Sequence, residues 1–190
     1  MKKHYFAIYK PFNMLSQFTS KDGSSVLGDL YNFPKDVYSI GRLDKDSEGL
    51  LLLTNDNKFK TKLLDQKNKL EKTYYVQVDN DITHEACKEL EAGKIIIKHE
   101  KKPYQVKPAK CIKIDEPNLP ERSVPIRYRK NIPTSWIALT LNEGKNRQVR
   151  QMTAAVGFPT LRLVRFGIGK LTIKGMQPGE IILIKPSDVL

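Results

Sequence analysis

The stretch from Gly41 to Asp56 constrains the fold of this 190-residue chain more than any other. Its first half, Gly41–Gly49, is polar and bracketed by glycines, which predicts an irregular loop. Its second half begins with four consecutive leucines, Leu50–Leu53, and ends in turn residues. A short apolar run with such bounds is typical of a strand buried on both faces, although periodicity alone leaves a helix open. A loop joined to a buried strand would hold its polar side chains in fixed positions.

Composition excludes several classes of protein. The chain is 39% hydrophobic and 28% charged, which is enough apolar content for the core of one domain. No apolar run approaches the roughly 20 residues of a membrane span, and the first residues lack the apolar stretch of a signal peptide. Cys87 and Cys111 stand apart, as do the three histidines, which predicts reduced, structural thiols and no metal site. We therefore expect a soluble cytoplasmic protein that acts as a monomer.

The charge balance points to a polyanionic partner. The chain has 33 Lys and Arg residues against 21 Asp and Glu, a net charge of +12. Between Asn142 and Gly175, seven basic residues accompany a single acid, Glu143. This imbalance favours one basic face over a mixed solvated surface, and nucleic acid is the first candidate partner. The seven basic residues are Lys145, Arg147, Arg150, Arg162, Arg165, Lys170 and Lys174.

Residue patterns along the chain predict a series of strands and three or four helices. The expected strands are His4–Tyr9, Val37–Ile40, Leu50–Leu53, Lys72–Val78, Ile95–Ile97, Ala109–Ile114, Trp136–Leu141, Leu161–Phe166 and Ile181–Ile184. The expected helices are Ser24–Leu30, Lys58–Gln66 with Asp56 as its cap, Thr83 to Glu91, and Arg147–Val156.

The order of these elements indicates the fold class. Strands cluster instead of alternating strictly with helices, which predicts an α+β fold with a mainly antiparallel mixed sheet and flanking helices. Residues 116–134 contain four prolines and a group of basic residues, so they form a long loop of the kind that is often functional. We expect residues 1–190 to form a single domain, with room for two lobes.

Three segments resemble the signatures of a known enzyme family. Residues 41–56 resemble the first signature of the bacterial type A pseudouridine synthases, which are named for small-subunit ribosomal RNA. Lys72-Thr73-Tyr74 is similar to the second signature, and the segment from Glu143 to Met152 is similar to the third. Two further stretches, residues 14–19 and 125–136, are similar to the large-subunit type E branch. We expect no S4-like RNA-binding module before the first strand, which is also the arrangement of that branch.

The resemblance implies an enzyme that isomerises a uridine of 23S ribosomal RNA, with a catalytic domain built around an RNA-binding cleft. The partner would be large-subunit ribosomal RNA or an assembling ribosomal subunit. The reaction exchanges a carbon–nitrogen bond for a carbon–carbon bond without redox change, so no cofactor is needed. Asp44 matches the catalytic aspartate, Arg150 would pair with it and fix its orientation, and Tyr74 would stack on the target uracil. By strand alternation, Tyr75 is the expected core residue of the two tyrosines.

The same resemblance and the charge pattern suggest which residues bind RNA. Arg42 would fill or clamp the gap left when the target base leaves its helix. Other basic residues would contact phosphates, which position an RNA without reading its sequence. These residues are Lys72, Arg127, Arg129, Lys130, Lys145, Arg147 and Arg165.

Two other functions remain open from the residues alone. A noncatalytic RNA-binding module or ribosome assembly factor would show the same basic face, and dependence of a modification on Asp44 would distinguish it. A basic enzyme of another class, such as a nuclease, usually needs several convergent carboxylates around metal ions. Dependence of activity on a divalent metal would identify that class.

Overall fold

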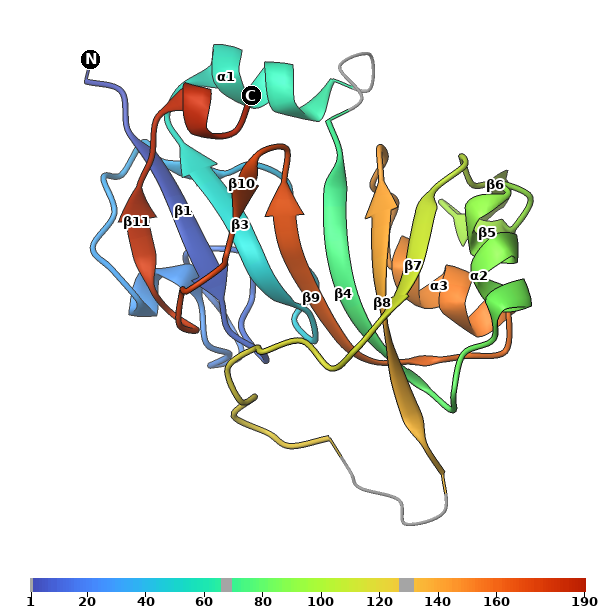
Figure 1. The fold of residues 1–190 in the computed structure, drawn as a ribbon. Helices are drawn as coiled ribbons and strands as arrows, with labels where there is room; N and C mark the ends of the chain where they lie inside the picture. The colour runs from blue at the N-terminus through green and yellow to red at the C-terminus, as the bar shows by residue number, and fades with distance from the viewer. Residues whose placement is uncertain (1, 66–69, 127–131) are drawn as a thin grey trace. The chain divides into compact units, whose positions relative to one another are not determined.

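The computed structural model describes residues 2–65, 70–126 and 132–190, and its residues form two compact units (Figure 1). Unit 1 consists of Met1–Leu70, Pro120–Val124 and Arg165–Leu190. Unit 2 consists of Glu71–Leu119 and Pro125–Val164. Strand β9 (Thr160–Ile168) contributes its first part to unit 2 and its last part to unit 1.

Unit 1 contains a sheet with the strand order β11-β1-β3-β9, with β2 beside β3 and β10 beside β9. Strands β1 and β3 are antiparallel, and their register pairs Lys10 with Gly49 and Tyr5 with Thr54. The elements are β1 (Tyr5–Lys10), β2 (Tyr38–Ser39), β3 (Glu48–Thr54), α1 (Asn57–Leu64), β10 (Leu171–Thr172) and β11 (Ile181–Leu183), with 3-10 turns at Leu27–Asp29 and Pro186–Asp188.

Strand β3 confirms the prediction of a strand buried on both faces, because all seven of its residues are buried. Leu51 and Leu53 pack in the core of unit 1 with Phe6, Ile8 and residues of the preceding loops. Helix α1 follows and buries Phe59 and Leu63. Leu64 lies at the last helical position, and its side chain is 48% exposed.

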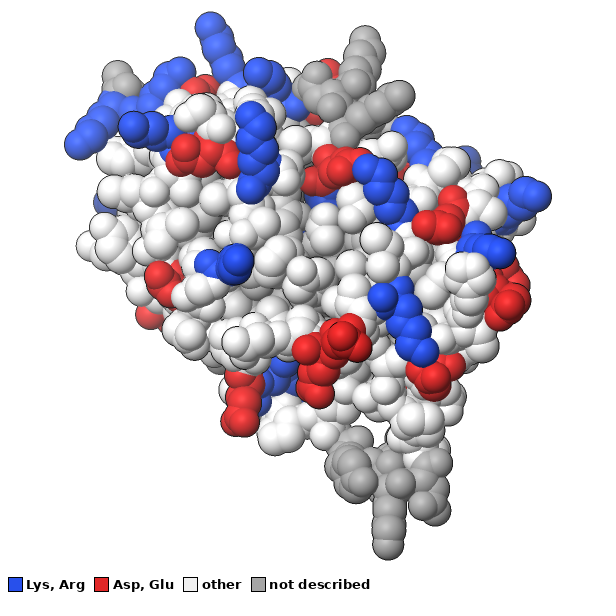
Figure 2. Space-filling view, viewed as in Figure 1, with Lys and Arg blue, Asp and Glu red and all other residues white. Residues whose placement is uncertain are grey.

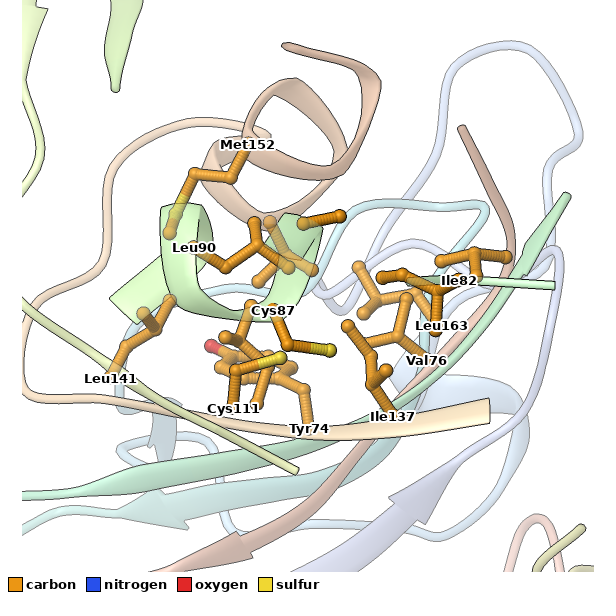
Figure 3. Packing of buried hydrophobic residues seen from close by; sticks show 14 of the residues in the cluster. Tyr74, Val76, Ile82, Cys87, Leu90, Cys111, Ile137, Leu141, Met152 and Leu163 are labelled. Atoms are coloured by element: carbon orange, nitrogen blue, oxygen red, sulfur yellow. The ribbon is translucent and has the colours of Figure 1, made fainter. Parts of the chain in front are cut away.

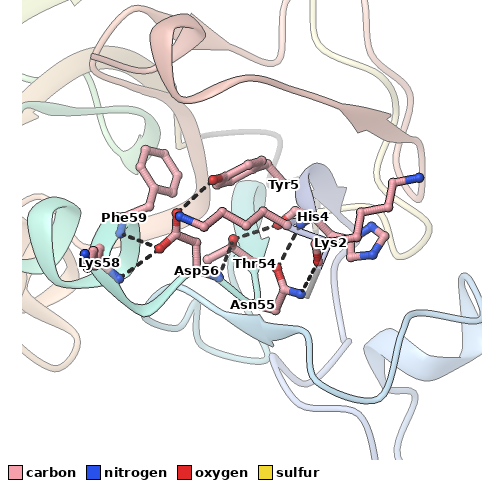
Figure 4. Close-up of polar contacts among 9 residues, drawn as sticks. Lys2, His4, Tyr5, Thr54, Asn55, Asp56, Lys58 and Phe59 are labelled. Atoms are coloured by element: carbon pink, nitrogen blue, oxygen red, sulfur yellow. Dashed lines mark hydrogen bonds and ion pairs between the residues drawn. The ribbon is translucent and has the colours of Figure 1, made fainter.

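A polar cluster ties the end of β3 to the first residues of the chain (Figure 4). The Asp56 carboxylate caps α1 by accepting hydrogen bonds from the backbone N–H groups of Lys58 and Phe59, as predicted. It also accepts 2.8 Å bonds from the Lys3 ammonium and the Tyr5 hydroxyl. These bonds lower the pKa of the Asp56 carboxyl. Asn55 adds a bond from the His4 N–H to its side-chain oxygen, so the chain beyond β3 turns sharply into α1.

Unit 2 contains a sheet with the strand order β9-β4-β8-β7 and a separate β5-β6 hairpin. Its antiparallel pairs β4–β8 and β7–β8 support the predicted mainly antiparallel sheet. The elements are β4 (Lys72–Asp79), α2 (His84–Glu91), β5 (Ile96–His99), β6 (Lys102–Gln105), β7 (Lys110–Ile114), β8 (Thr134–Leu141) and α3 (Gln148–Ala155). The α+β class is therefore confirmed, and β6 and β10 are strands that the sequence analysis missed.

The core of unit 2 packs helices α2 and α3 against the sheet (Figure 3). Tyr74 is buried in this core and Tyr75 is only half-buried, so the prediction that Tyr75 is the core residue is wrong. Tyr74 lies on the same face of β4 as Val76 and Val78, which is the face that the helices cover. Cys87 and Cys111 are free, buried thiols, and burial raises the pKa of Cys111 above its usual range.

Among the described helices, none combines the length and the apolar composition required to cross a lipid bilayer.

Gly49 is one position in unit 1 where the backbone requires a glycine. Its φ is +107°, and an added Cβ would overlap the backbone of Arg165 on β9. Gly23 also has a positive φ, +74°, but an added Cβ there meets nothing within 4 Å. We expect Gly23→Ala to cost about 1 kcal/mol of unfolding free energy, and Gly49→Ala to cost roughly 1–3 kcal/mol more because of overlap. Denaturant unfolding of both variants measures this difference, and equal losses would contradict it.

Candidate active site

Asp44 lies in the loop between β2 and β3, as predicted, and its backbone is held on both sides. Its carbonyl oxygen accepts a 3.0 Å hydrogen bond from the N–H of Ser47. The preceding residue, Leu43, is buried in the core of unit 1. The Ser16 hydroxyl accepts from the Leu43 N–H at 3.0 Å and donates to the Leu43 carbonyl at 2.7 Å. The Asp44 side chain itself is half-buried. It is therefore partly accessible to a substrate, while the backbone of Asp44 is fixed.

Lys10 is a buried cation close to this loop. Its side chain is fully buried, and its ammonium donates 2.8 Å hydrogen bonds to the carbonyl oxygens of Pro11 and Met14. Burial lowers the pKa of Lys10 to about 8, while the negative charges of Glu48, Asp46 and Asp44 oppose that decrease. Lys10 therefore fixes the turn that follows β1 and supplies positive charge near the acidic loop.

Arg165 is also buried, on the opposite side of β3 from β1. Its side chain is 5% exposed, and its Nε donates a 2.7 Å hydrogen bond to the carbonyl of Leu50. Arg162 is buried as well, at 8% exposure. These placements do not fit the predicted surface contact of Arg165 with phosphate, because β9 is an interior strand and the side chain bonds to the neighbouring backbone. Arg165 supports the start of β3 instead.

In unit 2, Glu143 organises the loop that leads into α3. Its buried carboxylate accepts hydrogen bonds from the Tyr104 hydroxyl at 2.6 Å, the Lys107 N–H at 3.0 Å and the Gln148 amide at 2.6 Å. Burial would raise the pKa of Glu143, but these three bonds lower it. The bond to Glu143 raises the pKa of Tyr104 to about 12. The one acid of this basic segment is therefore its structural centre.

The residues of the predicted third signature follow directly on this network. The N–H of Lys145 donates to the Gln148 side chain at 2.9 Å, and the Lys145 ammonium lies 4.7 Å from the centre of the Tyr104 ring. Arg147 is exposed, has a φ of +50° and directly precedes α3. Arg150 lies within the first turn of α3 and is half-buried. The loop thus presents basic side chains from a backbone that Glu143 and Gln148 hold in place.

The predicted site residues divide between the two units. Unit 1 holds Asp44 with Arg42, which is exposed two residues away. Unit 2 holds Tyr74, Lys72, Lys145, Arg147 and Arg150. The pairing of Arg150 with Asp44 and the RNA-binding cleft therefore stay predictions. Arg127, Arg129 and Lys130 lie outside the described residues.

The basic residues are distributed more widely than the sequence analysis expected. Figure 2 shows lysine and arginine side chains gathered over α1 and the chain ends of unit 1, with acidic side chains among them. Helix α1 lies outside residues 142–175, where the sequence predicted the basic face. Since Arg162 and Arg165 are buried, that segment contributes fewer surface charges than its composition indicates.

Lys10 and Ser16 are the residues of this site that the sequence analysis missed. Residues 14–19 carried only a resemblance to a family branch, and Lys10 lies just after the expected strand His4–Tyr9. A lysine before a proline normally suggests an exposed strand end. The hydroxyl of Ser16 bonds to Leu43, 27 positions later in the chain, and no local pattern reveals that contact.

The arrangement around Asp44 suits a carboxylate that must act from a fixed position. A carboxylate can attack an electrophilic carbon or stabilise positive charge that develops on a sugar ring. Both roles require accurate placement, and the backbone bonds on either side of Asp44 supply it.

The chain is similar to known proteins over most of its length. The profile of the RNA pseudouridylate synthase family matches residues 4–155. Ribosomal large subunit pseudouridine synthase E of Vibrio parahaemolyticus is 50% identical over 171 residues, which cover 90% of this chain and 69% of that protein. The enzyme of the same name from Xanthomonas campestris is 42% identical, with 90% of each chain covered.

A solved structure extends the likeness to the fold. The crystal structure of a pseudouridylate synthase superimposes with a TM-score of 0.78 at 27% identity. The superposition covers 99% of this chain and 73% of that one.

The low pKa of Lys10 predicts how stability depends on pH. Between pH 8 and pH 10.5 the unfolded chain binds more protons at this residue than the folded protein, so its contribution to stability rises with pH. We expect wild type to gain up to about 3 kcal/mol of unfolding free energy relative to Lys10→Met across this interval. Denaturant unfolding of both proteins at each pH measures the gain. A constant difference would show that Lys10 titrates normally.

Proposed function

The chain belongs to the RNA pseudouridylate synthase family, and we propose that its substrate is a uridine of large-subunit ribosomal RNA. The enzyme is an RNA pseudouridine synthase, an intramolecular isomerase. The observation that carries the proposed substrate is the extended similarity to relatives named for the large ribosomal subunit. The three sequence signatures fall in the matched region and support the same assignment.

Several finer features belong to this proposal. The signature residues support placement among the type A synthases named for small-subunit ribosomal RNA, and the names of the relatives support the large-subunit type E branch. We propose that residues 1–190 act as one catalytic domain comprising both units. We also propose a monomer that works in the cytoplasm, where bacterial ribosomal RNA is transcribed and matured.

The reaction needs no external atom except a proton exchanged with solvent. The bond between N1 of uracil and C1′ of ribose breaks, the base turns, and C5 bonds to C1′. The proton on C5 is then lost and N1 gains a proton, so uridine and pseudouridine have the same composition. The proposal therefore includes no cofactor.

We assign the central role in this exchange to Asp44. Its carboxylate would either bond to a carbon of the nucleotide or stabilise positive charge at C1′ as the N1 bond breaks. The loop bonds at Leu43 and Ser47 support this role, because they fix the backbone on both sides of Asp44.

Tyr74 and Arg150 have proposed roles that depend on the family signatures. Arg150 would form a planar, two-pronged pair with the Asp44 carboxylate, which a lysine could not reproduce. Tyr74 would stack on the uracil, and packing against the unit 2 core would hold its ring rigidly.

RNA binding would combine base extrusion with phosphate contacts. A stacked or paired uridine must leave its helix before the reaction, and the exposed Arg42 would occupy the gap. Lys72, Lys145 and Arg147 would contact phosphates. The basic residues Arg127, Arg129 and Lys130 would extend this contact along the RNA.

Replacement of Asp44 by Asn tests the catalytic assignment. The amide keeps nearly the same shape but supplies neither a nucleophile nor a negative charge, so we expect pseudouridine formation to stop while RNA binding persists. Tritium release from transcribed large-subunit RNA labelled at C5 of uridine measures turnover, and filter binding measures affinity. Turnover near the wild-type rate would overturn the assignment.

Removal of two charges at the start of α3 tests the phosphate contacts. We expect Lys145→Gln combined with Arg147→Gln to weaken RNA binding and to flatten the slope of log Kd against log salt by about 1.4, at roughly 0.7 per contact. Lys88→Gln combined with Lys94→Gln is the control, because it removes the same charge from exposed positions elsewhere in unit 2. Equal slopes for both double variants would exclude specific contacts at Lys145 and Arg147.

A further inference from the structure

We propose that Ser16 is a positioning residue for Asp44, and that its hydroxyl sets the rate of the chemical step without contacting the RNA. This inference rests on the proposed catalytic role of Asp44. Ser16 lies 28 positions before Asp44 in the sequence, yet its side chain bonds directly to the residue that precedes Asp44.

The contact between Ser16 and Leu43 is reciprocal. The serine oxygen accepts a hydrogen bond from the Leu43 N–H at 3.0 Å, and the same hydroxyl donates to the Leu43 carbonyl at 2.7 Å. Ser16 is 8% exposed and Leu43 is equally buried. One small side chain therefore satisfies both backbone polar groups of Leu43 at a buried place where water could not easily replace it.

These two bonds fix the backbone that carries Asp44. The Leu43 side chain packs in the core of unit 1, so this residue is held by its side chain and by both of its backbone groups. The Leu43 carbonyl belongs to the peptide plane that continues into Asp44, and this plane cannot rotate without breaking the bond to Ser16. The N–H of Ser47 bonds to the Asp44 carbonyl on the other side. Rotation of the Asp44 backbone is therefore restricted at both ends.

Ser16 can act in this way because its own segment is anchored. The N–H of Leu15 donates to the Ser25 carbonyl at 2.9 Å, and the N–H of Leu27 donates to the Gln17 carbonyl at 2.8 Å. The Lys10 ammonium bonds to the carbonyl of Met14. The backbone on either side of Ser16 is thus fixed before its hydroxyl meets the Asp44 loop.

Loss of the hydroxyl would release the peptide plane before Asp44 while Leu43 stays in the core. A displacement of about 1 Å of a catalytic group can reduce a rate by roughly 100-fold. We therefore expect Ser16→Ala to lower kcat by about 10- to 100-fold. Affinity for RNA should stay within about twofold of wild type, because a buried serine presents no surface to the substrate.

The chain offers a matched control in Ser135 of unit 2. Ser135 is 7% exposed, its oxygen accepts from the Ile82 N–H at 2.8 Å, and its hydroxyl donates to the Asn80 carbonyl at 2.9 Å. It therefore has the burial and the two backbone bonds of Ser16, but none of the residues that it joins belongs to the proposed active site. Ser135→Ala should lower the melting temperature about as much as Ser16→Ala and leave kcat near wild type.

The experiment measures kcat, KM and melting temperature for both alanine variants, with tritium release from transcribed large-subunit RNA as the assay. The assays run well below both melting temperatures, so that neither variant is unfolded. Ser16→Cys keeps nearly the size of the side chain but forms much weaker hydrogen bonds. This variant replaces Ser16→Ala in the experiment if Ser16→Ala does not fold. Ser16→Thr restores a hydroxyl and should recover most of the lost kcat.

The result that supports the proposal is a selective loss of kcat in Ser16→Ala and Ser16→Cys, with rescue by Ser16→Thr and none in Ser135→Ala. Equal kcat for all variants, or equal losses for both alanine variants, would overturn it. Failure of the proposed function is distinguishable, because wild type would then release no tritium or Asp44→Asn would remain active.

Discussion

Strand β3 is buried along its whole length, and this burial decides where unit 1 can place polar chemistry. All seven residues from Glu48 to Thr54 are inaccessible, so functional groups must lie before or after the strand. Before it lies the loop with Asp44, and after it lies the Asp56 cluster that joins the strand end to the first residues of the chain. One continuous stretch, residues 41–56, therefore contains a site, the strand that supports it and the polar anchor at the other end.

Most helices and strands could be predicted because the residues that determine them lie close together in the sequence. The leucine run, the caps at Asp56 and Thr83, and the alternation of β4 each depend on residues within a few positions. Errors occur where burial depends on distant neighbours. Alternation identifies two faces of β4 but does not tell which face the helices cover. The core position was therefore predicted for Tyr75, although Tyr74 occupies it. The sequence gives no sign that Arg165 is buried, because its burial results from the position of β9 inside the sheet, beside β3.

The candidate site was predictable to the same extent. The role proposed for Asp44 rests on a signature that is continuous in sequence. The loop around Asp44 is supported by Lys10 and Ser16, on a segment about 30 residues earlier. Unit 2 follows the same rule. Glu143 is a single acid in a basic segment, and its role becomes visible only through bonds to Tyr104 and Lys107, which lie nearly 40 residues before it.

The buried cations explain how a loop with several acids can remain close to an apolar strand. Burial alone would discharge Lys10, and the attraction of Asp44, Asp46 and Glu48 opposes that loss of charge. The same attraction draws the acidic loop toward the buried ammonium, while the carbonyls of Pro11 and Met14 hold the ammonium in place. Unit 1 thus supplies fixed positive charge near Asp44 without any residue of unit 2.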